Sequence, residues 1–371
     1  MVSRIALVGV ALLLCLPLVH FANEEWGEQP QVDFNSPEWA ARAELITRAR
    51  VMVPSPPDIR TVDLSQTPTH PVYSAASTDP VECRYVPKQA KATTAKFDCE
   101  LADGTVLKVK YGWTPEKYGE VAATRLISAL GFGADQVTLV ERLRCIGCPP
   151  FPFEMQRLAE SFFATTLLDL MTSNTRVRNF TWVAVEKKMA GRGIEVDPHE
   201  GWDWNELERI DPAKGGATRA EADALRLTAM FLSHWDNKYS NQRLICEERD
   251  GAGDDPLARC DTPFLIMQDL GATFGPTKVE LKPWIATSIW KRGPGCVIGM
   301  EDMPYHGGYF TSMHISEEGR ALLASKLTQL SDAQITALFT GARFKDVPAW
   351  VATFKDKVRQ IADRACPPLT D

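Results

Sequence analysis

The sequence predicts an α+β fold in two lobes, a small antiparallel sheet followed by a mainly helical part. Short runs rich in β-branched and aromatic residues fall within residues 81–111, and capped helical patterns dominate after residue 218. The chain has 371 residues, 44% of them hydrophobic and 24% charged, which is enough for a sizeable core. Its net charge is −7, whereas binding to the negatively charged phosphates of nucleic acid favours a positive protein surface. We therefore expect no nucleic-acid partner.

The N-terminus has the composition of an export signal. Arg4 precedes an apolar run over residues 5–19, which suits a signal-peptide core and is short for a membrane span of about 20 residues. We therefore expect residues 1–22 to be a signal peptide cleaved after Ala22, and the protein to be exported, either periplasmic or secreted. An uncleaved signal anchor is the alternative, because His20 is a poor residue at the minus-three position.

Eight cysteines follow the apolar run, and an even number in an exported chain indicates disulfides. Cys83 and Cys99 flank one candidate hairpin, and Cys246 and Cys260 flank another. We predict that these four residues form two disulfides, one at each hairpin.

A CxxC motif, Cys145-Ile-Gly-Cys148, raises two further possibilities. Such a pair can be redox-active or can bind zinc. However, no second CxxC follows to complete a zinc site, and no thioredoxin-like βαβ pattern surrounds the motif. A structural role for Cys145 and Cys148 is therefore favoured.

Composition divides the rest of the chain into three parts. Residues 23–80 contain many Pro, Ser, Thr and Asp and indicate an extension or linker, although Ser36 before Pro37 predicts one helix there. Residues 81–190 would form the first lobe and residues 191–371 the second.

Three strands and a helix are predicted at the start of the first lobe. A hairpin-type turn at Ala102-Asp-Gly104 separates the second strand from the third. A helix then begins at Thr114-Pro115 and stops at Gly131. The expected strands cover residues 81–86, 96–101 and 105–111.

Further elements follow along the chain. Residues 151–170 indicate a helix and residues 179–188 a strand, after which residues 189–193 break the pattern as a candidate hinge. Apolar residues at helical spacing predict a buried helix over residues 218–232, and residues 331–334 form a capping box.

The polar residues with the most informative spacing follow the buried helix. Asn241 stands five residues after Asp236, and Asp269 precedes Leu270-Gly271 at the end of an apolar run. Phosphoryl transfer needs a carboxylate near the attacking hydroxyl and oxygen ligands for magnesium. We therefore predict that Asp236 is the catalytic carboxylate and that Asn241 and Asp269 are metal ligands.

The candidate phosphate-binding residues lie on the predicted sheet and the helix after it. Lys110 ends the third strand on the same face as Lys108, where it could reach the α- and β-phosphates. Glu120 on the following helix would pair with Lys110 or assist the metal, with Glu116 as its rival. The loop between the first two strands has no glycine, so other residues would have to make the phosphate contacts there: Thr93, Thr94 and Lys96.

These positions resemble the atypical branch of the protein-kinase-like superfamily, and most closely its secretory-pathway, casein-type kinases. The run Glu120-Val-Ala-Ala-Thr-Arg-Leu126 is similar to their helix motif, while Asp236, Asp269 and Lys110 match the catalytic loop, the metal motif and the strand lysine. The resemblance covers about residues 81–275. It implies an exported bacterial relative with the two-lobed protein-kinase-like fold.

Two departures from that pattern matter. His234-Trp-Asp236 replaces the usual His-Arg-Asp, so the arginine that binds the phosphate group of a phosphorylated activation loop is absent. The glycine-free loop also differs from the usual glycine-rich nucleotide-binding loop.

The resemblance implies an enzyme that transfers the γ-phosphate of ATP to a hydroxyl acceptor with Mg²⁺ or Mn²⁺. The acceptor could be a protein, a glycan or a small molecule. Two alternatives stay open: an inactive pseudokinase that acts as a disulfide-bonded binding protein, and a nucleotidyl transferase that moves AMP. The joint presence of the four polar residues favours an enzyme: Lys110, Asp236, Asn241 and Asp269.

Overall fold

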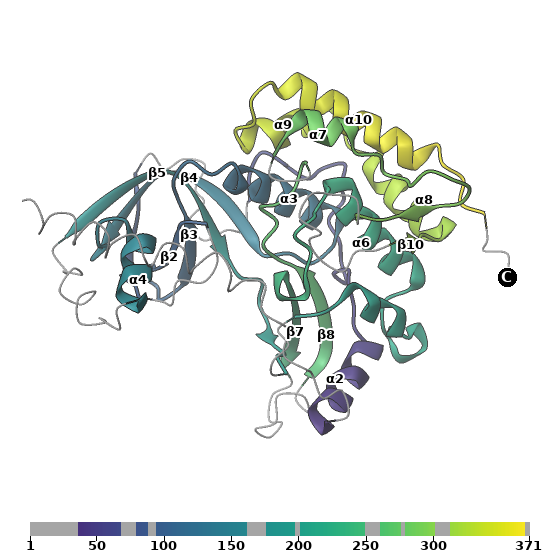
Figure 1. Ribbon diagram of the computed structural model, residues 1–371, viewed down its shortest axis with the longest axis horizontal. Helices are drawn as coiled ribbons and strands as arrows, with labels where there is room; N and C mark the ends of the chain where they lie inside the picture. Colours follow the sequence, from purple (N-terminus) through teal and green to yellow (C-terminus); the bar gives the residue numbers. More distant parts are fainter. Residues whose placement is uncertain are drawn as a thin grey trace, which may run out of the picture.

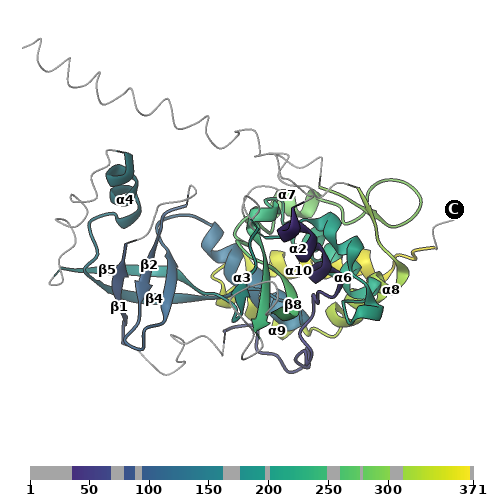
Figure 2. The same ribbon diagram turned by 90° about the horizontal axis from the view of Figure 1, so that it is seen from below.

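The computed structural model describes residues 36–67, 79–87, 94–161, 176–196, 201–248, 260–275, 279–300 and 312–367. The predicted signal peptide lies outside these residues. The fold is a mixed α/β structure in which half of the described strands gather at one end and the C-terminal helices lie toward the other (Figure 1). A view turned by 90° also shows these strands at one end and the C-terminal helices toward the other (Figure 2). None of the described helices is long and apolar enough to cross a membrane.

Five strands close into a small barrel in the order β1-β2-β3-β5-β4. The three predicted strands pair antiparallel, as expected, but β1 and β4 pair in parallel and close the barrel. This parallel pair corrects the prediction of a wholly antiparallel sheet. It arises because a helix returns the chain after β3, so that β4 runs in the same direction as β3 and β1. The strands are β1 (Val81–Val86), β2 (Lys96–Glu100), β3 (Val106–Lys110), β4 (Gln136–Ile146) and β5 (Val177–Lys187).

Strand alternation divides β3 between the barrel interior and its outer face. Leu107 and Val109 are fully buried in the barrel core, where they pack with apolar residues of the other strands. Lys108 and Lys110 alternate with them, so both lysines lie on the outer face. The prediction that the two lysines lie on the same face of the strand is therefore confirmed.

The helix after β3, α3 (Glu116–Leu130), packs against the segment that follows the second sheet. It ends at Gly131 in the left-handed conformation (φ 89°), as the sequence predicted. A Cβ at Gly119 would lie 2.8 Å from Val279 Cγ2 and 3.1 Å from the Gly271 carbonyl oxygen. Glycine thus allows α3 to approach the chain beside Leu270-Gly271 closely.

A second sheet has the order β6-β7-β8, and its strands β7 and β8 lie below α3 in the view of Figure 1. Its antiparallel β7–β8 pair is the hairpin predicted between Cys246 and Cys260. The short strand β6 lies within the candidate hinge and pairs with β7. The strands are β6 (Arg192–Gly193), β7 (Gln242–Glu248) and β8 (Cys260–Met267).

Most helices begin at residues that cap them. The predicted buried helix is α6 (Arg219–Leu232), where Thr218 and Glu221 form a capping box, and the predicted box at Ser331 begins α9 (Asp332–Gly341). The other described α-helices are α2 (Pro37–Thr47), α4 (Pro152–Ser161), α7 (Leu281–Ala286), α8 (Glu317–Leu327) and α10 (Val347–Ala362). Short 3₁₀ helices are η2 (Trp204–Arg209), η3 (Pro212–Lys214) and η4 (Tyr239–Asn241), and a small hairpin pairs β9 (Val297–Ile298) with β10 (Met313–His314).

The described part of the N-terminal extension packs into the main core. Leu45, Ile46, Val51 and Leu64 are each at most 2% exposed and belong to the same apolar cluster as α3 and α6. Arg42 forms a buried ion pair with a carboxylate of η2. Residues 36–67 thus contribute to the core, while the division of the chain at residues 80 and 190 stays a prediction.

Four disulfides cross-link the described residues. The two predicted bridges, Cys83–Cys99 and Cys246–Cys260, are confirmed, with Cα atoms 5.6 and 5.4 Å apart. The cysteines of the CxxC motif bond to each other, and Cys296 bonds to Cys366, 70 residues away in sequence. Such a number of disulfides is typical of extracellular proteins.

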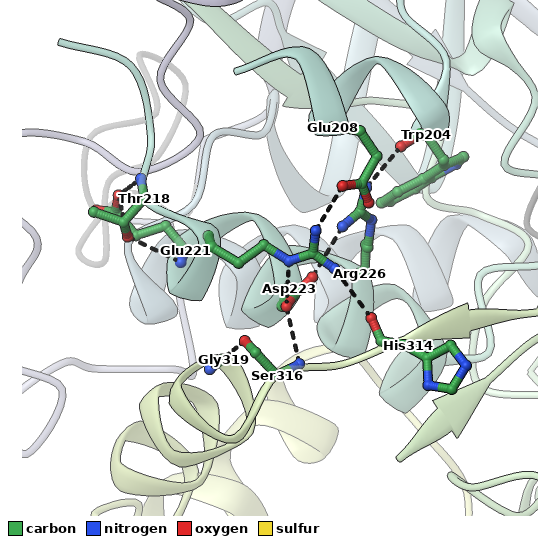
Figure 3. Close-up of polar contacts among 10 residues, drawn as sticks. Trp204, Glu208, Thr218, Glu221, Asp223, Arg226, His314, Ser316 and Gly319 are labelled. Carbon is green, nitrogen blue, oxygen red and sulfur yellow. Dashed lines mark hydrogen bonds and ion pairs between the residues drawn. The ribbon is translucent and has the colours of Figure 1, made fainter. Parts of the chain in front are cut away.

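A buried carboxylate on α6 joins this helix to η2 and to the start of α8 (Figure 3). Asp223 is fully buried and accepts hydrogen bonds from Arg226 Nη1 and Ser316 N, both at 2.9 Å, and from Arg219 Nε at 2.8 Å. The solvent-facing side of the cluster is Glu208, whose carboxylate lies 2.8 Å from Arg226 Nη2. The buried Asp223 therefore satisfies three donors at once.

We expect Asp223→Ala to lower the free energy of unfolding by about 3–5 kcal/mol, because buried Arg226 loses its one fully buried carboxylate partner and keeps only the half-exposed Glu208. Urea denaturation measures this loss. The control is Glu208→Ala, which removes a carboxylate that is 53% exposed and should cost less than about 1 kcal/mol. Equal losses in the two variants would contradict the role given to burial.

Candidate active site

Lys110 brings together three parts of the chain that are far apart in sequence. Its Nζ lies 2.8 Å from Glu120 Oε1 on α3 and 2.6 Å from Asp269 Oδ1, two residues beyond β8. Lys110 is 2% exposed and Glu120 is 1% exposed. Lys110 therefore contacts Glu120, which is one of the two roles predicted for that glutamate, and also Asp269.

The charges of this cluster depend on one another. Burial lowers the pKa of Lys110, but the carboxylates of Asp269 and Glu120 outweigh it and hold that pKa well above its usual value. Lys110 in turn holds the pKa of Asp269 far below its ordinary range. Burial raises the pKa of Glu120 to about 7, although Lys110 acts in the opposite direction. At neutral pH, therefore, Lys110 is protonated and the Asp269 carboxylate beside it is ionised.

Two further lysines extend the positive charge along the outer face of the barrel. Lys96 on β2 lies opposite Lys110, and Lys108 Nζ lies 2.5 Å from Glu186 Oε2 on β5. Burial lowers the pKa of Lys96, whereas both Lys96 and Lys108 help to lower the pKa of Asp269. Glu186 was missed in the sequence analysis, because only the register of β3 and β5 places it opposite Lys108.

The loop after α6 is tied to the chain just before Asp269. Asn241 Nδ2 donates to the Asp236 carbonyl oxygen at 2.7 Å, and Gln268 N donates to the Asn241 carbonyl oxygen at 3.1 Å. Since its amide nitrogen is used in this way, the amide oxygen of Asn241 is the atom that could ligate a cation. Asp236 keeps 32% of its side chain exposed, so its carboxylate can be reached from solvent.

Both candidate carboxylates act electrostatically on His234, which stands two residues before Asp236. The histidine is fully buried, and burial lowers its pKa, while Asp236 and Asp269 both act to raise it. Asp269 also has a left-handed backbone (φ 50°), which is uncommon for a residue other than glycine and is concentrated at functional sites. Hydrogen bonds thus connect Asn241 both to Asp236 and to Gln268, the residue before Asp269.

The predicted phosphate loop is described only in part. Thr93 lies outside the described residues, whereas Thr94 Oγ1 contacts the Glu116 carboxylate at the start of α3. Glu116 therefore holds the end of the loop and does not pair with Lys110. Between the two rival glutamates, it is Glu120 that contacts the lysine.

Asp135 joins the barrel to the second sheet and was not found from the sequence. Its Oδ1 accepts a hydrogen bond from Met189 N at 2.7 Å and lies 3.1 Å from Arg243 Nη1 on β7. Burial and the nearby Glu186 raise the pKa of Asp135 to about 6. Nothing in the local sequence Gly133-Ala-Asp135 signals this role, because the partners come from two other segments.

The raised pKa of Asp135 predicts a pH effect on stability. An aspartate in an unfolded chain titrates near about 4, so between that pH and about 6 the folded protein binds the additional proton. The contribution of Asp135 to the free energy of unfolding should therefore increase as the pH falls from 7 to 4, by up to about 3 kcal/mol. Asp135→Asn should not have this contribution, and its unfolding free energy should show a smaller increase in urea titrations. Parallel curves for the two proteins would contradict the prediction.

No family model matches the sequence, and no curated protein matches it either. Among solved structures, one match is the crystal structure of the Helicobacter pylori proinflammatory kinase CtkA. The match has 10% identity and a TM-score of 0.42, and it covers 77% of this chain and 96% of that chain. The function of this chain therefore has to be inferred from its own site.

Proposed function

We propose that the protein is an exported, two-lobed, kinase-like phosphotransferase that moves the γ-phosphate of ATP to a hydroxyl acceptor. The barrel would be the smaller lobe and the helical part the larger one. The observation that carries the proposal is the contact of Lys110 with both Glu120 and Asp269, beside the loop that holds Asp236 and Asn241.

The residues around Lys110 suit a nucleotide triphosphate. Its ammonium would bind phosphate oxygens, while Glu120 holds it in place from α3. Asp269 and the amide oxygen of Asn241 are hard oxygen donors of the kind that Mg²⁺ and Mn²⁺ prefer, so these two residues would hold the metal. The metal would supply neutralisation of the phosphate charge. Lys96 and Lys108 add positive charge to the same face, and the hydroxyl of Thr94 lies at the end of the loop that would cover the phosphates.

Asp236 would orient the acceptor. In the transfer, the acceptor oxygen forms a bond to the γ-phosphorus, the bond from that phosphorus to the bridging oxygen breaks, and ADP leaves. The hydroxyl proton would pass to Asp236. Its partly exposed carboxylate supports this role, since an acceptor must approach it from solvent. The acceptor would be a hydroxyl of a protein, a glycan or a small molecule.

We expect Asp269→Ala to abolish binding of ATP with Mn²⁺, because the metal loses its carboxylate and Lys110 loses a partner. Isothermal titration of the folded variant measures this. The control is Asp356→Ala, which removes an exposed carboxylate on α10 that pairs with Arg359 and should leave the affinity unchanged. An unchanged affinity in Asp269→Ala would contradict the proposed metal site.

Asp236→Asn should keep nucleotide binding and reduce phosphate transfer by roughly 10²–10⁴, the scale of a positioned general base. Incubation with γ-labelled and α-labelled ATP measures the transfer and separates movement of phosphate from movement of AMP. Label transferred from α-labelled ATP would identify a nucleotidyl transferase instead. No transfer by the parent protein would favour a binding protein, and equal non-zero transfer by both proteins would place the catalytic residue elsewhere.

A further inference from the structure

Four cysteines lie together in the barrel, where β1 and β4 pair in parallel. Cys83 and Cys145 are direct partners across that pair, and Cys99 comes from the neighbouring strand β2. Cys148 completes the CxxC motif just beyond β4. All four side chains are at most 3% exposed. The two disulfides that they form, Cys83–Cys99 and Cys145–Cys148, therefore belong to one buried cluster.

The sulfur atoms of the two disulfides are in contact. Cys99 Sγ lies 3.8 Å from Cys145 Sγ, although the two are not bonded to each other. The ligand atoms of Cys83, Cys99 and Cys145 all lie within 4.8 Å of one another, the single group of this kind among the described residues. Zn–S bonds are about 2.3 Å long, so sulfur atoms in a tetrahedral zinc site are about 3.8 Å apart. The spacing between the two disulfides is thus that of two ligands on one zinc ion.

The CxxC motif supplies the fourth ligand without a large movement of the backbone. Gly147 has a left-handed conformation (φ 83°) that turns the chain back after Cys145, and the Cα atoms of Cys145 and Cys148 are 5.7 Å apart. The second pair of ligands comes from separate strands and not from a second CxxC. The Cys145–Cys148 disulfide agrees with the predicted structural role, and a zinc site in the reduced chain would not require a second CxxC motif.

We propose that the reduced chain binds one Zn²⁺, or another thiophilic divalent cation, through Cys83, Cys99, Cys145 and Cys148. Four thiols bind the ion and release four protons. In an oxidising compartment the same thiols lose four electrons and four protons to a disulfide-forming oxidant and form the two observed disulfides. The barrel thus has two alternative cross-links, and the redox state of its surroundings selects one of them.

Either cross-link fastens the strands that support the candidate active site. Cys99 lies opposite Leu107 on β3, the strand that ends at Lys110. The metal would join β1, β2 and β4 beside that strand, whereas the disulfides join β1 to β2 and close the turn after β4. The metal site does not depend on the proposed phosphotransfer, and its test requires no enzyme activity.

The full chain, reduced with a phosphine and freed of metal, should bind one equivalent of Cd²⁺ and gain the ultraviolet charge-transfer absorption of cadmium thiolates. Zn²⁺ should displace the Cd²⁺ and abolish the absorption. Cys99→Ser should lose at least 10-fold in affinity. The matched control is the double variant Cys246→Ser/Cys260→Ser, which removes the β7–β8 disulfide and should still bind one equivalent. Absence of binding by the reduced parent, or loss of binding in the control alone, would overturn the proposal.

Alkylation of the parent protein keeps the proposal testable where Cys99→Ser does not fold. In the reduced chain, Zn²⁺ should slow iodoacetamide labelling of the four barrel cysteines, measured by peptide mass spectrometry, and leave labelling of Cys246 and Cys260 unchanged. Equal labelling of the barrel cysteines with and without Zn²⁺ would overturn the proposal.

Discussion

The architecture of the site depends on how the ammonium of Lys110 is kept charged in the interior. A lysine that is 2% exposed cannot remain ionised unless carboxylates compensate for the lost water. Glu120 and Asp269 provide this compensation from two different elements, so the end of β3, α3 and the segment after β8 must stay together. The same contacts prepare an anion site, because phosphate oxygens could replace carboxylate oxygens around the ammonium.

Several features of the backbone serve this contact. Alternation along β3 keeps Leu107 and Val109 in the barrel core while Lys110 points outward. Gly119 lets α3 approach the chain beside Gly271 within van der Waals distance. The hydrogen bond from Gln268 N to the Asn241 carbonyl oxygen then places the loop after α6 against the same segment. Packing and hydrogen bonding thus bring the polar residues together, and their charges set the pKa values that follow.

Three lysines contribute positive charge to the outer face of the barrel. Lys96, Lys108 and Lys110 all act on Asp269, and Glu186 balances Lys108. Asp135 connects this face to the second sheet through Met189 and Arg243. Buried carboxylates therefore occur both in the candidate site and at the junction beside it, where proton binding and folding are coupled.

The sequence by itself determined many of the elements and their order, because caps, turn residues and apolar periodicity act over a few neighbouring positions, but it did not predict β4. The strands before Lys110, the helix that carries Glu120, the capping boxes at Thr218 and Ser331 and the two hairpin disulfides were all predictable in this way. Only the tertiary structure decided which residues meet across the chain. The parallel closure of β1 on β4, the pairing of Lys108 with Glu186, the contact of Glu116 with Thr94 and the gathering of four cysteines depend on strand register and helix packing, which are set by the whole core and not by local sequence.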